Sequence, residues 1–243
     1  MAIYQSNLRA PDLRPYFKLL DPPMQHCGYD APSDPDFDPR CTYWTMDESA
    51  ILYNVAKSVP SGTWVDIGAR LGWTAATIAS AHPNEYYRVL AVDPELEVEA
   101  FWDRFCENTN HWDRFIWPYE LTASRFWNSN AANIYGGFEG FVIDGNHDSP
   151  EPLNDAKGAL AHAKPECIIM FHDTLGTAVR DGVRYLMDQG WRCRMYWTPN
   201  GVACCWRGYE GWMPPDHVPD PKMDFAPHKA LMVDMQDYWE RCE

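Results

Sequence analysis

The stretch of sequence that decides the fold is Trp64-Val65-Asp66-Ile67-Gly68-Ala69-Arg70-Leu71-Gly72-Trp73-Thr74-Ala75. An apolar run ends in an acid, breaks at two glycines, and continues into small helix-forming residues. This order is typical of a strand, a tight turn and a helix. A second apolar run, residues 88–92, is followed by Asp93. A glycine turn with a carboxylate at the next strand tip indicates a nucleoside site, because the carboxylate accepts hydrogen bonds from both ribose hydroxyls.

Composition and charge restrict the class of protein. The 243 residues suffice for one α/β domain with extensions. The chain has 20 basic and 35 acidic residues, a formal net charge of −15, and no run of lysine and arginine, so we expect no nucleic-acid partner. No apolar segment approaches the roughly 20 residues of a membrane span and the first residues resemble no signal peptide, so we expect no membrane association. The eight cysteines form no Cys-x-x-Cys pair, which favours a reducing cytoplasm.

Apolar runs and helical periodicities organise the chain. Strands that alternate with helices, followed by two strands around Asn200-Gly201, predict an α/β fold with a mostly parallel sheet and a C-terminal antiparallel hairpin. The expected strands are 63–67, 88–93, 114–117, 140–144, 167–171, 192–197 and 202–206, and the expected helices are 13–20, 46–59, 72–81, 95–107, 124–132, 150–163, 177–189 and 228–241. We expect residues 1–46 to form an irregular extension or lid, 47–210 the main domain, and 211–243 a tail.

Acids and imidazoles follow several of these strands. Asp144 and His147 come after the fourth strand, and His172 and Asp173 end the fifth. Because ligands in open parallel sheets bind beyond the carboxyl ends of the strands, we expect these side chains to converge on one rim. Two carboxylates and an imidazole suit a divalent metal ion, and His147 is placed to take a proton from a substrate. The alternative is that each residue caps the turn or helix that follows it.

The glycine loop, Asp93, the Asp-x-x-His motif and His172-Asp173 follow one another along the chain. This succession of motifs resembles that of class I S-adenosylmethionine-dependent methyltransferases. The resemblance covers residues 46–207 and is closer to small-molecule O-methyltransferases, which include macrolide-sugar enzymes of the mycinamicin and macrocin type and relatives from cephalosporin biosynthesis. Residues 66–74 are similar to the loop of that group, acid-x-Gly-x-x-x-Gly-x-Ser/Thr, which cradles the methionine part of the cofactor. Phe141-Val142-Ile143-Asp144-Gly145-Asn146-His147 resembles its fourth-strand signature, and Ile168-Ile169-Met170-Phe171-His172-Asp173 resembles the end of its fifth strand.

The resemblance implies a Rossmann-like domain over residues 47–210 that binds S-adenosylmethionine and a divalent metal ion, Mg²⁺ or Mn²⁺. It assigns to the cofactor the residues Asp66, Gly68, Ala69, Gly72, Thr74, Asp93, Ser124 and Asp144. It assigns Asp144, His172 and Asp173 to the metal, and His147 to the general base. The metal-dependent members usually have Glu or Asp where this chain has His172, and histidine is a poor ligand for Mg²⁺. Either the metal differs, or only the two aspartates bind it, or His172 performs acid-base chemistry without a metal.

The function that the resemblance implies is methyl transfer to a hydroxyl of a small molecule, such as a natural product or a sugar. Two alternatives keep the fold: a relative that catalyses an elimination or rearrangement, and a non-catalytic binding protein. An NAD-dependent enzyme is disfavoured because the loop lacks the Gly-x-Gly-x-x-Gly pattern. The aromatic residues of the extension, which include Tyr43 and Trp44, form a lid over the substrate or cover the exposed side of the sheet. The substrate and the oligomeric state, including a homo-oligomer, stay open.

Overall fold

The computed structural model describes residues 7–18, 44–82, 86–220 and 226–235. Its centre is a seven-stranded sheet with the strand order β3-β2-β1-β4-β5-β7-β6. Strands β1 to β5 pair in parallel, whereas β7 pairs antiparallel with both β5 and β6. The predicted α/β fold with a C-terminal antiparallel hairpin is therefore confirmed. The strand order reverses between β1 and β4, and ligands in such sheets bind beyond the carboxyl ends at this reversal.

The strands and helices follow the alternation expected from the sequence. The strands are β1 (Thr63–Ile67), β2 (Arg88–Val92), β3 (Ile116–Tyr119), β4 (Phe138–Ile143), β5 (Ala163–Phe171), β6 (Arg192–Tyr196) and β7 (Val202–Arg207). The α-helices are α1 (Met46–Lys57), α2 (Trp73–Ala81), α3 (Glu99–Thr109), α4 (Ala123–Trp127), α5 (Asn130–Ile134), α6 (Glu151–His162), α7 (Thr177–Asp188) and α8 (Ala226–Asp234). The described chain also has three short 3₁₀ helices. Arg14–Tyr16 lies before α1, Pro94–Glu97 lies before α3, and Asn110–Trp112 follows α3.

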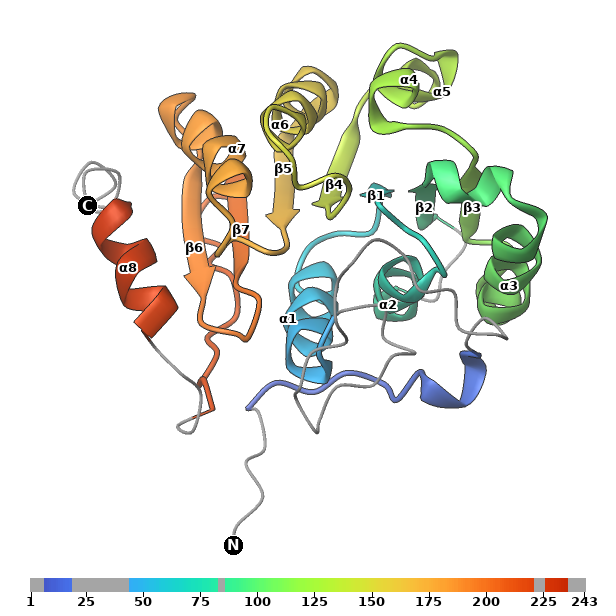
Figure 1. Ribbon diagram of the computed structural model, residues 1–243, viewed down its shortest axis with the longest axis horizontal. Coiled ribbons are helices and arrows are strands. Elements are labelled where there is room, and N and C mark those ends of the chain that lie inside the picture. The colour runs from blue at the N-terminus through green and yellow to red at the C-terminus, as the bar shows by residue number, and fades with distance from the viewer. Residues whose placement is uncertain (1–6, 19–43, 83–85, 221–225, 236–243) are drawn as a thin grey trace, which may run out of the picture.

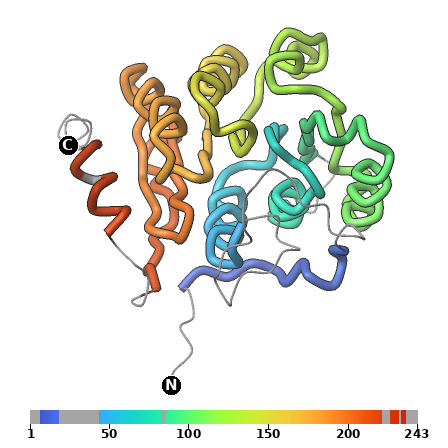
Figure 2. The backbone as a smooth tube through the Cα atoms, viewed as in Figure 1, coloured from blue at the N-terminus to red at the C-terminus, as the bar shows by residue number. Residues whose placement is uncertain are grey.

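Helices cover both faces of the sheet, so the domain has three layers (Figures 1 and 2). Successive strand residues point to opposite faces, which divides the core into two buried clusters. One cluster joins strand residues such as Trp64 to apolar residues of α1, α2 and α3, and the other joins neighbours such as Val65 to residues of α4, α6 and α7. This sandwich leaves the ends of the strands as the edges where polar side chains gather.

The structure differs from the expected elements mainly at their ends. The third strand lies at Ile116–Tyr119 instead of 114–117. The helix expected over 95–107 is divided, because the Asp93 side chain accepts a hydrogen bond from the Glu95 backbone and caps the short 3₁₀ helix Pro94–Glu97 before α3 begins. The helix expected over 124–132 is likewise two short helices, α4 and α5. Of the helix expected over 13–20, only Arg14–Tyr16 is helical among the described residues. The last expected helix, over 228–241, corresponds to α8, which begins at Ala226, and residues 236–241 lie outside the described residues.

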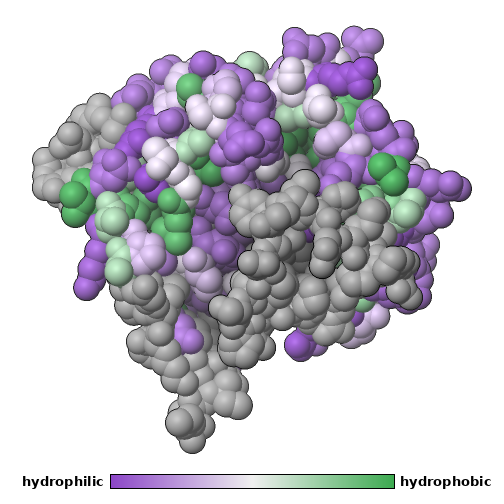
Figure 3. All heavy atoms as spheres, viewed as in Figure 1, coloured by the Kyte–Doolittle hydropathy of each residue, from purple (hydrophilic) through white to green (hydrophobic). Residues whose placement is uncertain are grey.

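The exterior is largely hydrophilic, as Figure 3 shows for one face. The exposed large apolar residues of the described chain come from separate segments, for example Tyr86, Ile134 and Val233. None of the described helices combines the length and apolar character that a membrane crossing requires.

Candidate functional site

Backbone hydrogen bonds tie together the loops that leave β1, β2, β4 and β5. Gly68 N donates to Val92 O (2.9 Å), Asp144 N to Ile67 O (2.9 Å), and His172 N to Ile143 O (3.2 Å). The parallel ladders therefore continue one residue past the strand ends, into the loops that carry the predicted site residues. These loops share one edge of the sheet, as expected from the sequence.

The glycine turn after β1 lies directly against the loop after β4. Gly68 has a φ of 87°, in the left-handed region, and a Cβ at this position would lie 2.1 Å from the carbonyl oxygen of Asp144. Only glycine permits both the dihedral angle and this approach. The contact places the predicted cofactor loop beside Asp144, the first predicted site residue after β4.

Asp66 links the end of β1 to the first turn of α2. It is fully buried, and its Oδ2 accepts a hydrogen bond of 2.5 Å from Thr74 Oγ1, while its Oδ1 has no hydrogen-bond partner. Burial raises the pKa of Asp66 to about 7, and the hydrogen bond from Thr74 opposes this shift. A buried carboxyl with a free acceptor oxygen beside a glycine turn is suited to a cationic or hydrogen-donating group of a ligand.

Asp93 is held at the tip of β2 by two backbone amides. Arg70 N donates to its Oδ2 (2.8 Å) and Glu95 N to its Oδ1 (2.7 Å). Arg70 has a φ of 45°, and its guanidinium Nε lies 3.5 Å from Glu95 Oε2. Asp93 is almost fully buried, which raises its pKa to about 6. Each oxygen keeps a lone pair, so the carboxylate can still accept two ribose hydroxyls.

The remaining residues predicted for the cofactor lie on the same loops and on α4. Gly72 also has a φ of 87° and precedes α2, and Ala69 is buried between the two glycines. Ser124 is exposed in the first turn of α4, after β3. Their contacts with the cofactor stay predictions.

Three predicted site residues form one compact cluster at this edge (Asp144, His147 and Asp173). Each offers one ligand atom, and these atoms lie within 4.8 Å of one another. His147 Nδ1 lies 3.3 Å from Asp173 Oδ2, and its Nε2 lies 3.3 Å from Asp144 Oδ1 without the alignment of a hydrogen bond. The set of two carboxylates and an imidazole, all partly exposed, fits a divalent ion such as Mn²⁺ better than Mg²⁺.

His172 lies behind this cluster and has no exposed surface. Its Nδ1 lies 3.1 Å from Asp144 Oδ1 and 3.3 Å from Asp173 Oδ2, and its Nε2 lies 3.2 Å from Glu48 Oε2. The imidazole thus bridges the cluster and α1. His147, not His172, joins Asp144 and Asp173 in the compact cluster.

The carboxylates and imidazoles of this edge shift one another's ionisation. Burial alone would lower the pKa of His172, but the charges of Asp144 and Glu48 raise it well above its ordinary value. Burial alone would also lower the pKa of His147, but the contact with Asp144 raises it above its ordinary value. Burial raises and His172 lowers the pKa of Asp144, and the lowering prevails. The carboxylates therefore favour the protonated forms of both imidazoles, and the imidazoles favour the ionised form of Asp144.

Two contributors to this site were not predicted as site residues from the sequence. Glu48 reads as a helix-start acid because Thr45 and Glu48 form a capping box at α1. Asn200 reads as a turn residue of the hairpin, yet its backbone and side chain both donate to Glu48. Trp44, expected as a lid or a cover, is buried and donates from Nε1 to Asp144 Oδ2 (2.6 Å). Tyr43 lies outside the described residues.

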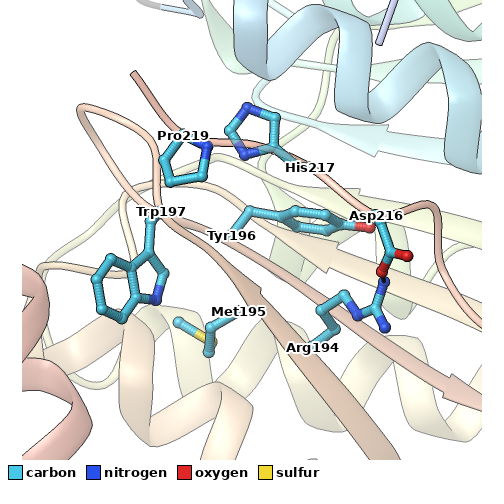
Figure 4. Close-up of a pocket in the computed structure, with 7 residues that line it drawn as sticks. All are labelled: Arg194, Met195, Tyr196, Trp197, Asp216, His217 and Pro219. Carbon is cyan, nitrogen blue, oxygen red and sulfur yellow. Dashed lines mark hydrogen bonds and ion pairs between the residues drawn. The ribbon is translucent and has the colours of Figure 1, made fainter. Parts of the chain in front are cut away.

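A separate pocket of about 300 Å³ lies at the C-terminal end of the hairpin strand β6 (Figure 4). Its lining comes from β6, the residue after it and the segment 216–219. His217 of this pocket lies 2.6 Å from Asp47 Oδ2, and Asp47 precedes Glu48 on α1. Arg194 pairs with Asp216 on the other side (2.7 Å). The pocket contains none of the predicted site residues, and its contact with Asp47 fastens the tail segment to α1.

Comparison with known proteins agrees with this geometry. Residues 65–174 match a family model described as a methyltransferase domain. The match begins in β1 and ends just after Asp173, so it includes both the glycine turn and the Asp144 cluster. No curated protein sequence matches the chain.

Solved structures show the same fold at low sequence identity. The O-methyltransferase from Bacillus cereus, in complex with SAH, is 15% identical with a TM-score of 0.56, over 66% of this chain and 80% of that one. The O-methyltransferase from Streptomyces achromogenes involved in tomaymycin synthesis, in complex with SAM, is 14% identical with a TM-score of 0.57, over 68% and 82%. An SAH-bound methyltransferase from Podospora anserina is 13% identical with a TM-score of 0.56, over 71% and 83%. The domain therefore has the fold of S-adenosylmethionine-dependent O-methyltransferases.

Proposed function

We propose that this protein is an S-adenosylmethionine-dependent O-methyltransferase that acts on a hydroxyl of a small molecule, such as a natural product or a sugar. The observation that carries the proposal is the packing of Gly68 against the carbonyl of Asp144. This contact joins a nucleoside-type turn to a cluster of acid-base groups within the methyltransferase domain. A cytoplasmic location and the absence of a nucleic-acid partner remain expectations from composition.

The cofactor role is supported by the acceptor capacity that remains on the two buried acids, which is the unpartnered Oδ1 of Asp66 and one lone pair on each oxygen of Asp93. In this proposal Asp93 accepts the ribose hydroxyls, and the free Oδ1 of Asp66 faces the amino group of the methionine part. The turn formed by Gly68, Ala69 and Gly72 lets the cofactor approach the backbone. Thr74 holds Asp66, and Ser124 is proposed to contact the adenine.

The proton is proposed to pass to His147. The methyl group of a sulfonium is already activated, so the protein needs to align it with the hydroxyl and accept one proton. The His147 side chain is 34% exposed, and its Nε2 has no hydrogen-bond partner. Asp144 and Asp173 on either side stabilise the imidazolium that forms when the ring takes the proton.

A divalent ion is proposed to be held by Asp144 and Asp173. Their oxygens lie in one cluster beside the His147 ring, and two carboxylates suit a divalent ion such as Mg²⁺ or Mn²⁺. When bound, such an ion lowers the pKa of a hydroxyl that coordinates it. Because a nitrogen that binds a metal cannot also accept a proton, the proposal keeps His147 as the base and leaves the ligand role to the aspartates.

The experiment that tests the proposed function is isothermal titration calorimetry, with S-adenosylmethionine and its demethylated product as the ligands. Asp93→Asn should weaken binding of both by about 2–4 kcal/mol, since the negative charge and one of the two acceptor oxygens that face the ribose hydroxyls are lost. Glu97→Gln is the matched control, because Glu97 lies on the same 3₁₀ helix and is exposed. Unchanged affinity in Asp93→Asn would remove this residue from the cofactor site, and no binding to the unaltered protein would refute the function.

A further inference from the structure

Glu48 is a buried carboxylate whose capacity for hydrogen bonds is filled. It has no exposed surface, although it lies in the first turn of α1. Its Oε1 accepts from Asn200 N (3.1 Å), and its Oε2 accepts from Thr45 N (2.8 Å) and Asn200 Nδ2 (3.2 Å) and lies 3.2 Å from His172 Nε2. These partners come from α1, the hairpin turn and the end of β5. The carboxylate therefore joins three elements at one fixed point.

The ring of His172 has a single orientation between two carboxylates. Its Nε2 faces Glu48 Oε2, and its Nδ1 faces Asp144 Oδ1 at 3.1 Å. The indole of Trp44 stacks on the imidazole, with ring centroids 4.4 Å apart and an interplanar angle of 16°. Rotation of the ring would break both hydrogen bonds and the stacking contact.

The carboxylate of Asp144 receives one donor on each oxygen. His172 Nδ1 approaches its Oδ1, and Trp44 Nε1 donates to its Oδ2 at 2.6 Å. Two donors on opposite oxygens determine the plane of a carboxylate, and the remaining lone pairs then point in set directions. His147 lies 3.3 Å from Oδ1 on the partly exposed side of this plane.

We propose that Glu48 is a positioning residue, which fixes the ring of His172 and, through it, the carboxylate plane of Asp144 at the methyl-transfer site. The role of Asp144 in that site rests on the proposed function, whereas the chain from Glu48 to Asp144 does not. Both nitrogens of His172 face carboxylate oxygens of this chain. The ring therefore bridges Glu48 on one side to Asp144 and Asp173 on the other.

The capping box by itself does not account for Glu48. A cap at this position uses one side-chain oxygen, and Glu and Gln serve equally well. Glu48 instead also faces donors from His172 and Asn200, which do not belong to the cap. Glu48→Gln can keep the oxygen that accepts from Thr45 N and faces His172 Nε2, but it removes the negative charge beside His172 and places an amide N–H against Asn200 N. The substitution therefore tests the charge that faces His172 while the cap is retained.

The test is an NMR measurement of two ring protons that report on Asp144, which are His172 Nδ1–H and Trp44 Nε1–H. Both are buried, and we expect both to be slowly exchanging and shifted downfield in the unaltered protein, with His172→Gln and Trp44→Phe assigning them. Glu48→Gln should shift both resonances and lower the melting temperature, because a buried charge that accepts several hydrogen bonds is lost, while the protein stays folded at the temperature of measurement. Glu139→Gln is the matched control: Glu139 also accepts a backbone hydrogen bond, from Thr63 N (2.7 Å), and should shift neither.

Two results would overturn the proposal. They are unmoved His172 and Trp44 resonances in Glu48→Gln, and equal shifts of these resonances in Glu139→Gln. If Glu48→Gln does not fold, Asn200→Ala removes one donor to Glu48 and should shift the same two resonances by a smaller amount, and no shift again contradicts the proposal.

A second readout uses Mn²⁺ alone as the probe. Groups that orient the ligands of a metal typically change its affinity by about 10–100-fold when they are mutated. Glu48→Gln should weaken Mn²⁺ binding by that factor and leave the affinity for S-adenosylhomocysteine unchanged. Glu48→Gln in a His172→Gln background should cause no further loss, because Glu48 acts through His172. If the unaltered protein binds no Mn²⁺, the metal part of the proposed function fails, and the NMR measurement still decides the role of Glu48.

Discussion

Substitution of Asp66 by asparagine is expected to remove a large part of the pH dependence of stability. Burial raises the pKa of this carboxyl from 3.8 to about 7 in the folded protein. Between these two values the folded state holds a proton that the unfolded chain has released. The stability that Asp66 contributes is therefore complete below about pH 4 and is lost as the pH rises through 7.

The size of this loss follows from the shift in pKa. A change of about three units corresponds to roughly 4 kcal/mol, because each unit is worth about 1.4 kcal/mol. In Asp66→Asn the amide oxygen can still accept the hydrogen bond from Thr74, while the amide nitrogen takes the place of the unpartnered Oδ1. That second change shifts the stability by the same amount at every pH, so the slope against pH isolates the ionisation.

Urea denaturation of the ligand-free protein between pH 4 and pH 8 provides the measurement. The free energy of unfolding of the unaltered protein should fall relative to that of Asp66→Asn by several kcal/mol over this range. Asp155, whose pKa burial raises to about 6, contributes equally to both proteins and cancels in the difference. Asp113→Asn, at an exposed position, is the control. Parallel pH profiles for the unaltered protein and Asp66→Asn would refute the argument from burial.

Three further predictions concern the site and the turn. His147→Ala should lower turnover by about 10²–10⁴-fold with unchanged affinity for S-adenosylhomocysteine, and should abolish the rise of rate with pH that release of the His147 proton causes in the unaltered enzyme; normal turnover would assign the proton transfer elsewhere. Exhaustive chelation should remove activity and Mn²⁺ should restore it, whereas full activity with no metal by elemental analysis would defeat the metal proposal. Gly68→Ala should lower the melting temperature far more than Gly136→Ala, because both positions have a positive φ but only the Cβ at 68 meets another atom, the carbonyl of Asp144; equal losses would contradict this packing argument.

Much of the fold was predictable because its signals are local. The apolar runs, the glycine turn and the Asn-Gly hairpin depend on neighbouring residues, and each predicted strand is present with shifts of a few residues at its ends. The rim was also predictable, since parallel strands place their carboxyl ends at one edge. Element ends were less accurate, because side-chain caps such as that of Asp93 set them.

The partners of each rim residue could not be predicted, because they come from distant parts of the chain. Periodicity places Glu48 at a helix start, but 124 residues separate it from His172 and 152 from Asn200. The sequence by itself determined the order of the strands, the turn at Gly68 and the gathering of Asp144, His147, His172 and Asp173 at one edge. Only the tertiary structure decided that His172 faces inward to Glu48 while His147 faces the two aspartates. Which way a ring points depends on the donors and acceptors packed around it, and these are brought together only when α1 and the hairpin close against the sheet.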